Sequence, residues 1–285
     1  MKIMDLIKLT RIEHAIMLAI AIVIGEIIPA KKFPEMGMAF LSFLPAIFIE
    51  IASFSINDYF DFETDRINRR MDRPIAAGKI SRSFAHKFAI ISFLIGILIA
   101  STINFNAFII AVIFAFLSYL YSYKLKDMAF IGNLYVATTM AIPFIYGNFV
   151  VSDNLGMTIL IISLIAFTTG LAREITQTIR DIRGDKKGRG SKTLPMAIGI
   201  KKSAFIASLL YVIAVILSLI PYLYIENYKS NIYYIIPIAV TDVILIYIAL
   251  NIIKSQTKGF LNKSRNMSLF AMFIGLLGFL FGALV

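Results

Sequence analysis

Apolar segments long enough to cross a lipid bilayer recur along the 285-residue chain. A transmembrane α-helix needs about 20 predominantly apolar residues, because the hydrocarbon core is roughly 30 Å thick. Nine such segments lie at roughly 12–30, 38–57, 87–103, 105–123, 129–150, 156–176, 203–224, 232–252 and 267–285. The sequence therefore predicts an all-α polytopic membrane protein, with one domain over residues 1–285. We expect a bundle of nine transmembrane helices around a central cavity.

The composition excludes several classes of protein. An apolar content of 59% and a mean hydropathy of +0.83 rule out a soluble domain. The formal net charge of +11 fits a membrane surface better than nucleic acid, given the long apolar runs. Without cysteine there are no disulfides or thiolate sites, and only two histidines, His14 and His86, argue against a His-rich metal centre. The first apolar run opens a series of similar runs, so we interpret it as a spanning helix and not a cleavable signal peptide.

Basic residues are distributed unequally over the connecting segments. Of the 28 Lys and Arg, 24 lie at the amino terminus and in the connectors after the second, fourth, sixth and eighth apolar segments. Only Lys31, Lys32 and Lys229 lie on the other side, and Arg173 lies inside the sixth segment. Because cytoplasmic loops carry the excess of positive charge, we predict a cytoplasmic amino terminus in the cell membrane. The second and sixth helices then both end on the cytoplasmic side, where we expect the active site to open.

An acidic cluster follows the second apolar segment, with the pattern N-D-x-x-D-x-x-x-D. At about 100° per residue, a helix places Asn57, Asp58, Asp61 and Asp65 on one face and Glu63 on the other. Carboxylates beside a bilayer core are costly, so they indicate function. Their oxygens suit Mg²⁺, which in turn binds phosphates. The cluster therefore predicts a magnesium site for a phosphorylated substrate.

A second acidic cluster follows the sixth apolar segment. Glu174, Thr178, Asp181 and Asp185 step at i, i+4, i+7 and i+11, which places them on one helical face. Gly184 predicts that the helix ends or loosens there. We expect Asp181 and Asp185 to hold a second Mg²⁺, and Glu174 and Thr178 to contact the substrate. With both clusters on the cytoplasmic side, they can face each other across one cavity.

Basic residues beside these clusters are candidate ligands for phosphate oxygens. The candidates are Arg11, Arg66, Arg73, Lys126, Lys187, Arg189 and Lys192. For each one, the alternative is a topological role as a positive-inside residue. Glu50 and Asp242 lie inside predicted helices and either pair with other polar groups or line the cavity. His14 is either packed or a base.

The two acidic motifs together resemble those of the UbiA superfamily of intramembrane prenyltransferases. The resemblance rests on N-D-Y-F-D-F-E-T-D at 57–65 with D-R-P-I at 72–75, and on D-I-R-G-D at 181–185 with K-K-G-R-G-S-K-T-L-P after it. It covers nearly the whole chain, including the nine apolar segments. The run E-T-D-R-I-N at 63–68 and the R-E-I at 173–175 resemble the archaeal ether-lipid branch of the superfamily.

This resemblance implies a Mg²⁺-dependent transfer of a geranylgeranyl group. Geranylgeranyl diphosphate would be the donor, and the free hydroxyl of geranylgeranylglyceryl phosphate the acceptor. Asp61, Asp181 and Glu174 are the catalytic candidates, and the proton acceptor stays open between Asp61, Glu174 and the substrate phosphate. One alternative is an aromatic acceptor, as in quinone biosynthesis, which needs fewer cationic ligands. Another is a cation-coupled transporter, which would place its carboxylates near the bilayer midplane. The oligomeric state is open.

Overall fold

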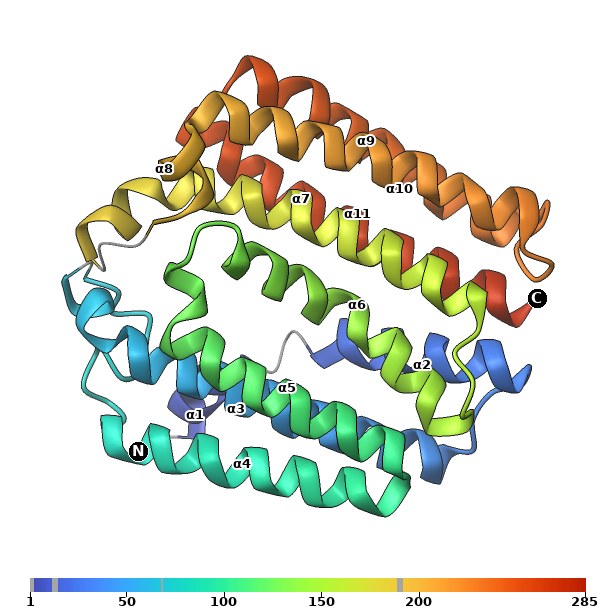
Figure 1. The fold of residues 1–285 in the computed structure, drawn as a ribbon, viewed down its shortest axis with the longest axis horizontal. Helices are drawn as coiled ribbons and strands as arrows, with labels where there is room; N and C mark the ends of the chain where they lie inside the picture. Colours follow the sequence, from blue (N-terminus) through green and yellow to red (C-terminus); the bar gives the residue numbers. More distant parts are fainter. Residues whose placement is uncertain (1–2, 12–14, 68, 189–191) are drawn as a thin grey trace. The chain divides into compact units, whose positions relative to one another are not determined.

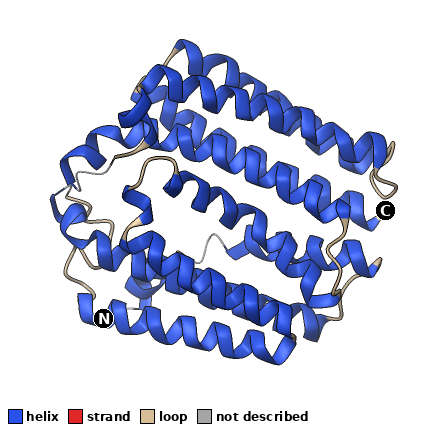
Figure 2. Ribbon diagram, viewed as in Figure 1, coloured by secondary structure: helices blue, strands red, loops and turns tan. Residues whose placement is uncertain are grey.

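The computed structural model describes residues 3–11, 15–67, 69–188 and 192–285, with the backbone alone for residue 3 and residues 183–188. Every regular element in these ranges is a helix, and no strand occurs in them (Figure 2). The elements are α1 (Ile3–Thr10), α2 (Ala15–Ala30), α3 (Met36–Ile67), α4 (Arg82–Ile103), α5 (Phe105–Tyr123), the 3₁₀ helix η2 (Leu125–Asp127), α6 (Ile131–Val151), α7 (Met157–Gly188), α8 (Leu194–Ile198), α9 (Ile200–Tyr224), α10 (Ile232–Lys254) and α11 (Lys258–Leu284).

Eight of the described helices are long and apolar enough to cross a membrane. The segments Met4–Thr10 and Ala15–Ala30 make a ninth if they are counted as one bent span. Each of the nine predicted segments coincides with one long helix between α2 and α11, and the short helices η2 and α8 lie between these segments. The prediction of an all-α polytopic membrane protein is therefore confirmed.

Two helices extend well beyond the predicted apolar segments, in agreement with the helical spacing of the two acidic motifs. The second predicted segment stops at residue 57, whereas α3 continues to Ile67 and carries the whole first acidic motif. The sixth stops at residue 176, whereas α7 continues to Gly188. The expectation that the helix ends or loosens at Gly184 is wrong, because the helical backbone passes through this residue. A helical glycine costs only about 1 kcal/mol relative to alanine, which the flanking turns can offset.

The helices form two compact units. The first comprises residues 1–19, 35–127 and 184–191, and the second comprises residues 20–34, 128–183 and 192–285. In the first unit, α4 and α5 pack along α3 (Figure 1). Small residues of α3 and α4, Ala52 and Ala89, are fully buried at this contact beside Ile56 and Phe93. This packing holds the end of α3, and hence the acidic motif, against two neighbouring helices.

The amino-terminal helix α1 belongs to the same unit. Leu9 of α1 is fully buried against Ile75, Ile80 and Ala85, which come from the loop after α3 and from the start of α4. Asp5 of α1, which is buried, forms an ion pair with the exposed Lys79 of this loop at 3.8 Å. The apolar cluster and the ion pair join α1 to the 69–81 loop.

In the second unit, α2 and α6 cross at two glycines. A Cβ atom at Gly147 would lie 2.1 Å from the Ile22 carbonyl oxygen, and one at Gly25 would lie 2.3 Å from the Phe144 carbonyl oxygen. Only glycine permits so close an approach of the two backbones, as is common between membrane helices.

Aromatic residues connect α9, α10 and α11 in this unit. Tyr228 and Tyr234 are fully buried, and each packs against Phe279. The Tyr228 hydroxyl donates to the Phe279 carbonyl oxygen at 3.0 Å. One of the undecided acidic residues, Asp242 of α10, accepts a hydrogen bond from Ser218 of α9 at 2.8 Å, so it pairs with another polar group within the helices.

Candidate functional site

The last turns of α3 present the first acidic motif on one face. The Asn57 amide donates to Asp61 Oδ2 at 3.0 Å, as expected for residues one turn apart. Asp58 is 1% exposed and Asp65 is 9% exposed, whereas Glu63 is exposed. The prediction that Glu63 lies apart from the other four residues is therefore confirmed.

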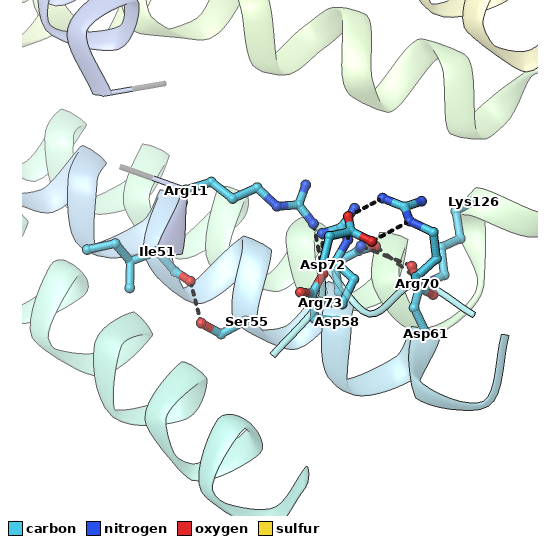
Figure 3. Close-up of polar contacts among 10 residues, drawn as sticks. Arg11, Ile51, Ser55, Asp58, Asp61, Arg70, Asp72, Arg73 and Lys126 are labelled. Carbon is cyan, nitrogen blue, oxygen red and sulfur yellow. Dashed lines mark hydrogen bonds and ion pairs between the residues drawn. The ribbon is translucent and has the colours of Figure 1, made fainter. Parts of the chain in front are cut away.

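Asp58 accepts hydrogen bonds from two arginines of other segments. Arg11, which follows α1, and Arg73, in the loop after α3, each donate to Asp58 Oδ1 at 2.8 Å (Figure 3). The other oxygen, Oδ2, is buried and accepts no hydrogen bond from a described residue. The Arg11 guanidinium also lies over the Phe54 ring at 4.5 Å, one turn before Asp58 on α3. Two predicted phosphate ligands thus lie together on the acidic motif.

Lys126 brings a third cation to this motif from η2. Its ammonium group donates to Asp61 Oδ1 (Figure 3). It also donates to Asn57 Oδ1 at 3.4 Å. Burial lowers the pKa of Lys126 to about 8, although neighbouring carboxylates oppose the shift. Lys126 therefore brings a buried positive charge to two oxygens of the predicted metal site.

The loop after α3 adds a pair that the sequence analysis did not single out. Arg70 donates two hydrogen bonds to Asp72, at 3.0 and 2.9 Å. The Arg70 guanidinium holds the pKa of the Asp72 carboxyl below its ordinary value. Arg66, a predicted phosphate ligand, is exposed and lies over the Phe62 ring at 5.5 Å. Within the described residues, Arg66 forms no ion pair with a carboxylate of α3.

The second motif lies on α7. The Gln177 amide donates to Glu174 Oε2 at 3.0 Å. The Thr178 hydroxyl donates to the Ile175 carbonyl oxygen at 2.9 Å and accepts from the Asn133 amide of α6 at 3.5 Å. Glu174 and Thr178 are both half-buried, one turn apart on the same helix.

Asp181 forms a two-bond pair with its neighbour Arg180. Arg180 Nε donates to Asp181 Oδ1 at 2.8 Å, and Arg180 Nη2 makes a short contact with Oδ2. The Asp181 side chain is 48% exposed.

Lys192, a predicted phosphate ligand, is exposed. The side chains of Asp185 and Lys187, and residues 12–14 and 189–191 with His14 and Arg189, lie outside the described part of the chain.

Several contacting residues were missed at the sequence level. Phe54 could have been predicted from the sequence, because a residue four positions before Asp58 shares its helical face. Arg180 could have been predicted too, since it adjoins a predicted ligand. For Asn133 and Gln177, only a polar side chain within a spanning helix could have indicated a contact. Arg70 was seen only as one of many loop cations.

The oxygen atoms at the end of α3 fit a hard cation such as Mg²⁺. A positive charge, the Lys126 ammonium, already contacts side-chain oxygens of Asn57 and Asp61, which lie one turn apart on this face. No group of three or more carboxylate or imidazole side chains in the described residues is arranged to hold a metal by itself. Mg²⁺ commonly binds through one or two carboxylates together with substrate phosphates and water, and these residues suit that mode.

Comparison with known proteins links this geometry to a family. The model of the UbiA prenyltransferase family matches residues 18–277. A digeranylgeranylglyceryl phosphate synthase from Archaeoglobus fulgidus is 38% identical over 275 residues, which cover 96% of this chain and 94% of the relative. A solved structure described as digeranylgeranylglyceryl phosphate synthase in membranes has 34% identity and a TM-score of 0.80, with 99% of this chain and 98% of that chain covered. A UbiA homologue from Archaeoglobus fulgidus, bound to GPP and Mg²⁺, has 21% identity and a TM-score of 0.67, with 96% and 99% covered, and so shares the fold.

Proposed function

This chain belongs to the UbiA prenyltransferase family, and from that membership we propose that it transfers a geranylgeranyl group from geranylgeranyl diphosphate to the free hydroxyl of geranylgeranylglyceryl phosphate. The observation that carries the choice of acceptor is full-length similarity to proteins named digeranylgeranylglyceryl phosphate synthase, at 38% and 36% identity for two of them. The family match over residues 18–277 supports one prenyltransferase domain over the whole chain.

We propose that both acidic motifs act on the same donor molecule. Of the four predicted ligands on α3, Asn57, Asp61 and Asp65 would supply oxygens for one Mg²⁺, whereas Asp58 already pairs with two arginines. Asp181 and Asp185 would hold another Mg²⁺. Bound Mg²⁺ would polarise the diphosphate and stabilise the negative charge that develops on it as it leaves. The Mg²⁺ in a homologue of the same fold, bound together with a prenyl diphosphate, supports this assignment.

Basic residues would bind the diphosphate oxygens that the carboxylate-held metal leaves free. Arg11, Arg73 and Lys126 already lie on the first motif. Positive charges placed where negative charge develops during a reaction usually make the largest single contribution to transition-state stabilisation. The further proposed ligands are Arg66, Lys187, Arg189 and Lys192, with Thr178 as a neutral contact.

In the proposed reaction, the C1–O bond of the donor breaks and its electron pair leaves with the diphosphate. The hydroxyl oxygen of the acceptor bonds to C1 and loses its proton. The proton passes to a carboxylate of Asp61 or Glu174, or to the acceptor's own phosphate. Asp181 would contribute by holding a Mg²⁺ that binds the leaving diphosphate. The apolar helices that surround such a site exclude water, which would otherwise capture the allylic carbon.

We also propose that the protein lies in the cell membrane with a cytoplasmic amino terminus. The excess of Lys and Arg in alternate connectors supports this orientation. The active site would then open toward the cytoplasm, where a water-soluble diphosphate headgroup can approach it.

A reconstituted transfer assay tests the function. Purified protein receives geranylgeranyl diphosphate with either geranylgeranylglyceryl phosphate or 4-hydroxybenzoate, in Mg²⁺ or in EDTA. We expect a Mg²⁺-dependent diether product with the glyceryl phosphate alone. A product with the aromatic acid alone would contradict the proposed acceptor and move the enzyme to quinone synthesis. No product with either acceptor would reject the proposed reaction.

A further inference from the structure

Two features separate Asp58 from the other carboxylates of α3. Its side chain is 1% exposed, and a single oxygen, Oδ1, accepts from both Arg11 and Arg73 at 2.8 Å. Asp61 instead contacts the Lys126 ammonium and the Asn57 amide. Lys126 can turn away on its flexible stem when a metal approaches, whereas two guanidinium groups on one buried oxygen leave little room there.

Arg11 is held in its position by its backbone and its stacking. It adopts a left-handed conformation, φ +47°, where glycine is usual, and its N–H group closes α1 by donating to the Ile7 carbonyl oxygen at 3.0 Å. The guanidinium then lies on the Phe54 ring as well as on Asp58. Uncommon backbone angles of this kind persist where surrounding contacts enforce them, often at functional sites.

Arg73 comes from the loop that packs under α1. Its N–H group donates to the Arg70 carbonyl oxygen, and its own carbonyl oxygen accepts from Ala77, so the backbone is fixed on both sides. Its Nε is buried without a hydrogen-bond acceptor among the described residues, and a carboxylate oxygen of Asp72 lies 3.9 Å from it. A buried guanidinium N–H group of this kind is available for an anion.

The charges at this point are unequal. At Asp58 itself two guanidinium groups meet one carboxylate, because the next carboxylate, Asp72, is held by Arg70 at 2.9 Å and lies 3.9 Å from Arg73. Each guanidinium has five N–H donors, and the recorded hydrogen bond to Asp58 uses one of them in each arginine. The remaining donors can bind phosphate oxygens in the forked manner that arginine favours.

We propose that Asp58 is a positioning residue and not a metal ligand: it fixes Arg11 and Arg73 so that their free N–H groups bind the diphosphate of the donor. This proposal rests on the proposed function and assigns a distinct role to one residue of its first motif. The buried Oδ2 atom is the one route by which Asp58 could still hold a metal. The Mg²⁺ concentration that donor binding requires therefore distinguishes a metal ligand from a positioning residue.

The test measures binding of an unreactive thio analogue of geranylgeranyl diphosphate, by calorimetry, over a series of Mg²⁺ concentrations. Asp58→Asn keeps the shape of the side chain and removes its charge. We expect its Kd at saturating Mg²⁺ to rise about 10- to 100-fold, the usual consequence of breaking a buried charge pair. The Mg²⁺ concentration at half-maximal binding should stay as in the wild type. Asp61→Asn is the matched control, and it should need more Mg²⁺.

A double-mutant cycle provides the second readout. If Asp58 acts only through the two arginines, Asp58→Asn should have little further effect on Kd in the Arg11→Gln, Arg73→Gln background. The two single arginine variants should each weaken binding without changing the Mg²⁺ requirement. They also keep the proposal testable if Asp58→Asn fails to fold, which its thermal transition will reveal.

Each outcome decides between the roles. A raised Mg²⁺ requirement in Asp58→Asn, like that of Asp61→Asn, would make Asp58 a metal ligand and overturn the proposal. Unchanged Kd in Asp58→Asn, fully additive effects in the cycle, or arginine variants that bind as the wild type does would overturn it too. Wild-type protein that does not bind the analogue at any Mg²⁺ concentration would reject the proposed function, and this proposal with it.

Discussion

Asp58 and Asp61 lie one turn apart on α3 and have different partners. Asp58 accepts from two arginines, which stay charged at any physiological pH. Asp61 accepts from Lys126, whose pKa of about 8 is lowered by burial. The Lys126 ammonium can be replaced by a metal ion at Asp61, whereas the two guanidinium groups stay bound to Asp58. Two carboxylates of one motif can therefore have different roles: we propose that Asp61 binds a metal ion, and that Asp58 positions the arginines that bind the diphosphate.

Acid should weaken the fold slightly through Asp72. Because its pKa is lowered in the folded state, mainly by the Arg70 hydrogen bonds, Asp72 stabilises the protein above its ordinary pKa of 3.8. This contribution is lost as pH falls through the lowered pKa. Asp72 is 61% exposed, so the effect should stay below about 1 kcal/mol.

Thermal unfolding midpoints in detergent, measured from about pH 6 down to pH 3, check this expectation. The wild type should lose more stability than Asp72→Asn over the acid part of this range. Arg70→Gln should behave as Asp72→Asn does, since it removes the other half of the pair. Parallel acid profiles for all three proteins would show that the pair contributes nothing.

At the scale of single elements, hydropathy predicted the apolar part of each long helix, and the spacing of the acidic residues predicted the helical turns that follow it in α3 and α7. Hydropathy falls at residue 57, where the acidic motif begins, although the α3 backbone stays helical for ten more residues to Ile67. The one-sided spacing of Asn57, Asp58, Asp61 and Asp65 was readable because helical geometry is local. The contact between Arg11 and Asp58 was not, because it joins residues 47 positions apart. Such contacts depend on packing that no spacing rule contains.

The crossing of α2 and α6 should not tolerate a side chain at Gly147. The added methyl group in Gly147→Ala would overlap the Ile22 carbonyl oxygen, with its carbon 2.1 Å away. The helices must then separate, at a cost of about 1–3 kcal/mol or more for overpacking. The thermal midpoint of the purified variant measures this cost.

Gly259→Ala is the matched control, because nothing lies within 4 Å of a Cβ atom at this helical position. It should be neutral or stabilising by up to about 1 kcal/mol. A Gly147→Ala variant as stable as Gly259→Ala would contradict the close crossing.

At the scale of the whole molecule, the account requires both acidic motifs to open to one side of the membrane. The chain has no cysteine, so single introduced cysteines can be labelled without background. Met71→Cys and Lys201→Cys replace exposed residues on the predicted cytoplasmic side, and Lys32→Cys and Lys229→Cys replace exposed residues on the other. A membrane-impermeant maleimide, applied to sealed vesicles of known orientation, should label the first two from the cytoplasmic side and the others from the opposite side. Labelling of Met71→Cys and Lys201→Cys from different sides would contradict the topology.

The most direct test of the central claim, that both motifs act on one donor, is Mg²⁺-dependent binding of the unreactive thio analogue to Asp61→Asn, Asp181→Asn and the control Glu63→Gln. Glu63 lies on the same helix as Asp61 but is exposed, away from the other acidic residues. The account predicts that each aspartate substitution alone abolishes or strongly weakens binding, while Glu63→Gln binds as the wild type does. If folded Asp61→Asn or folded Asp181→Asn bound the analogue as tightly as the wild type, at the same Mg²⁺ concentration, the shared site would be contradicted.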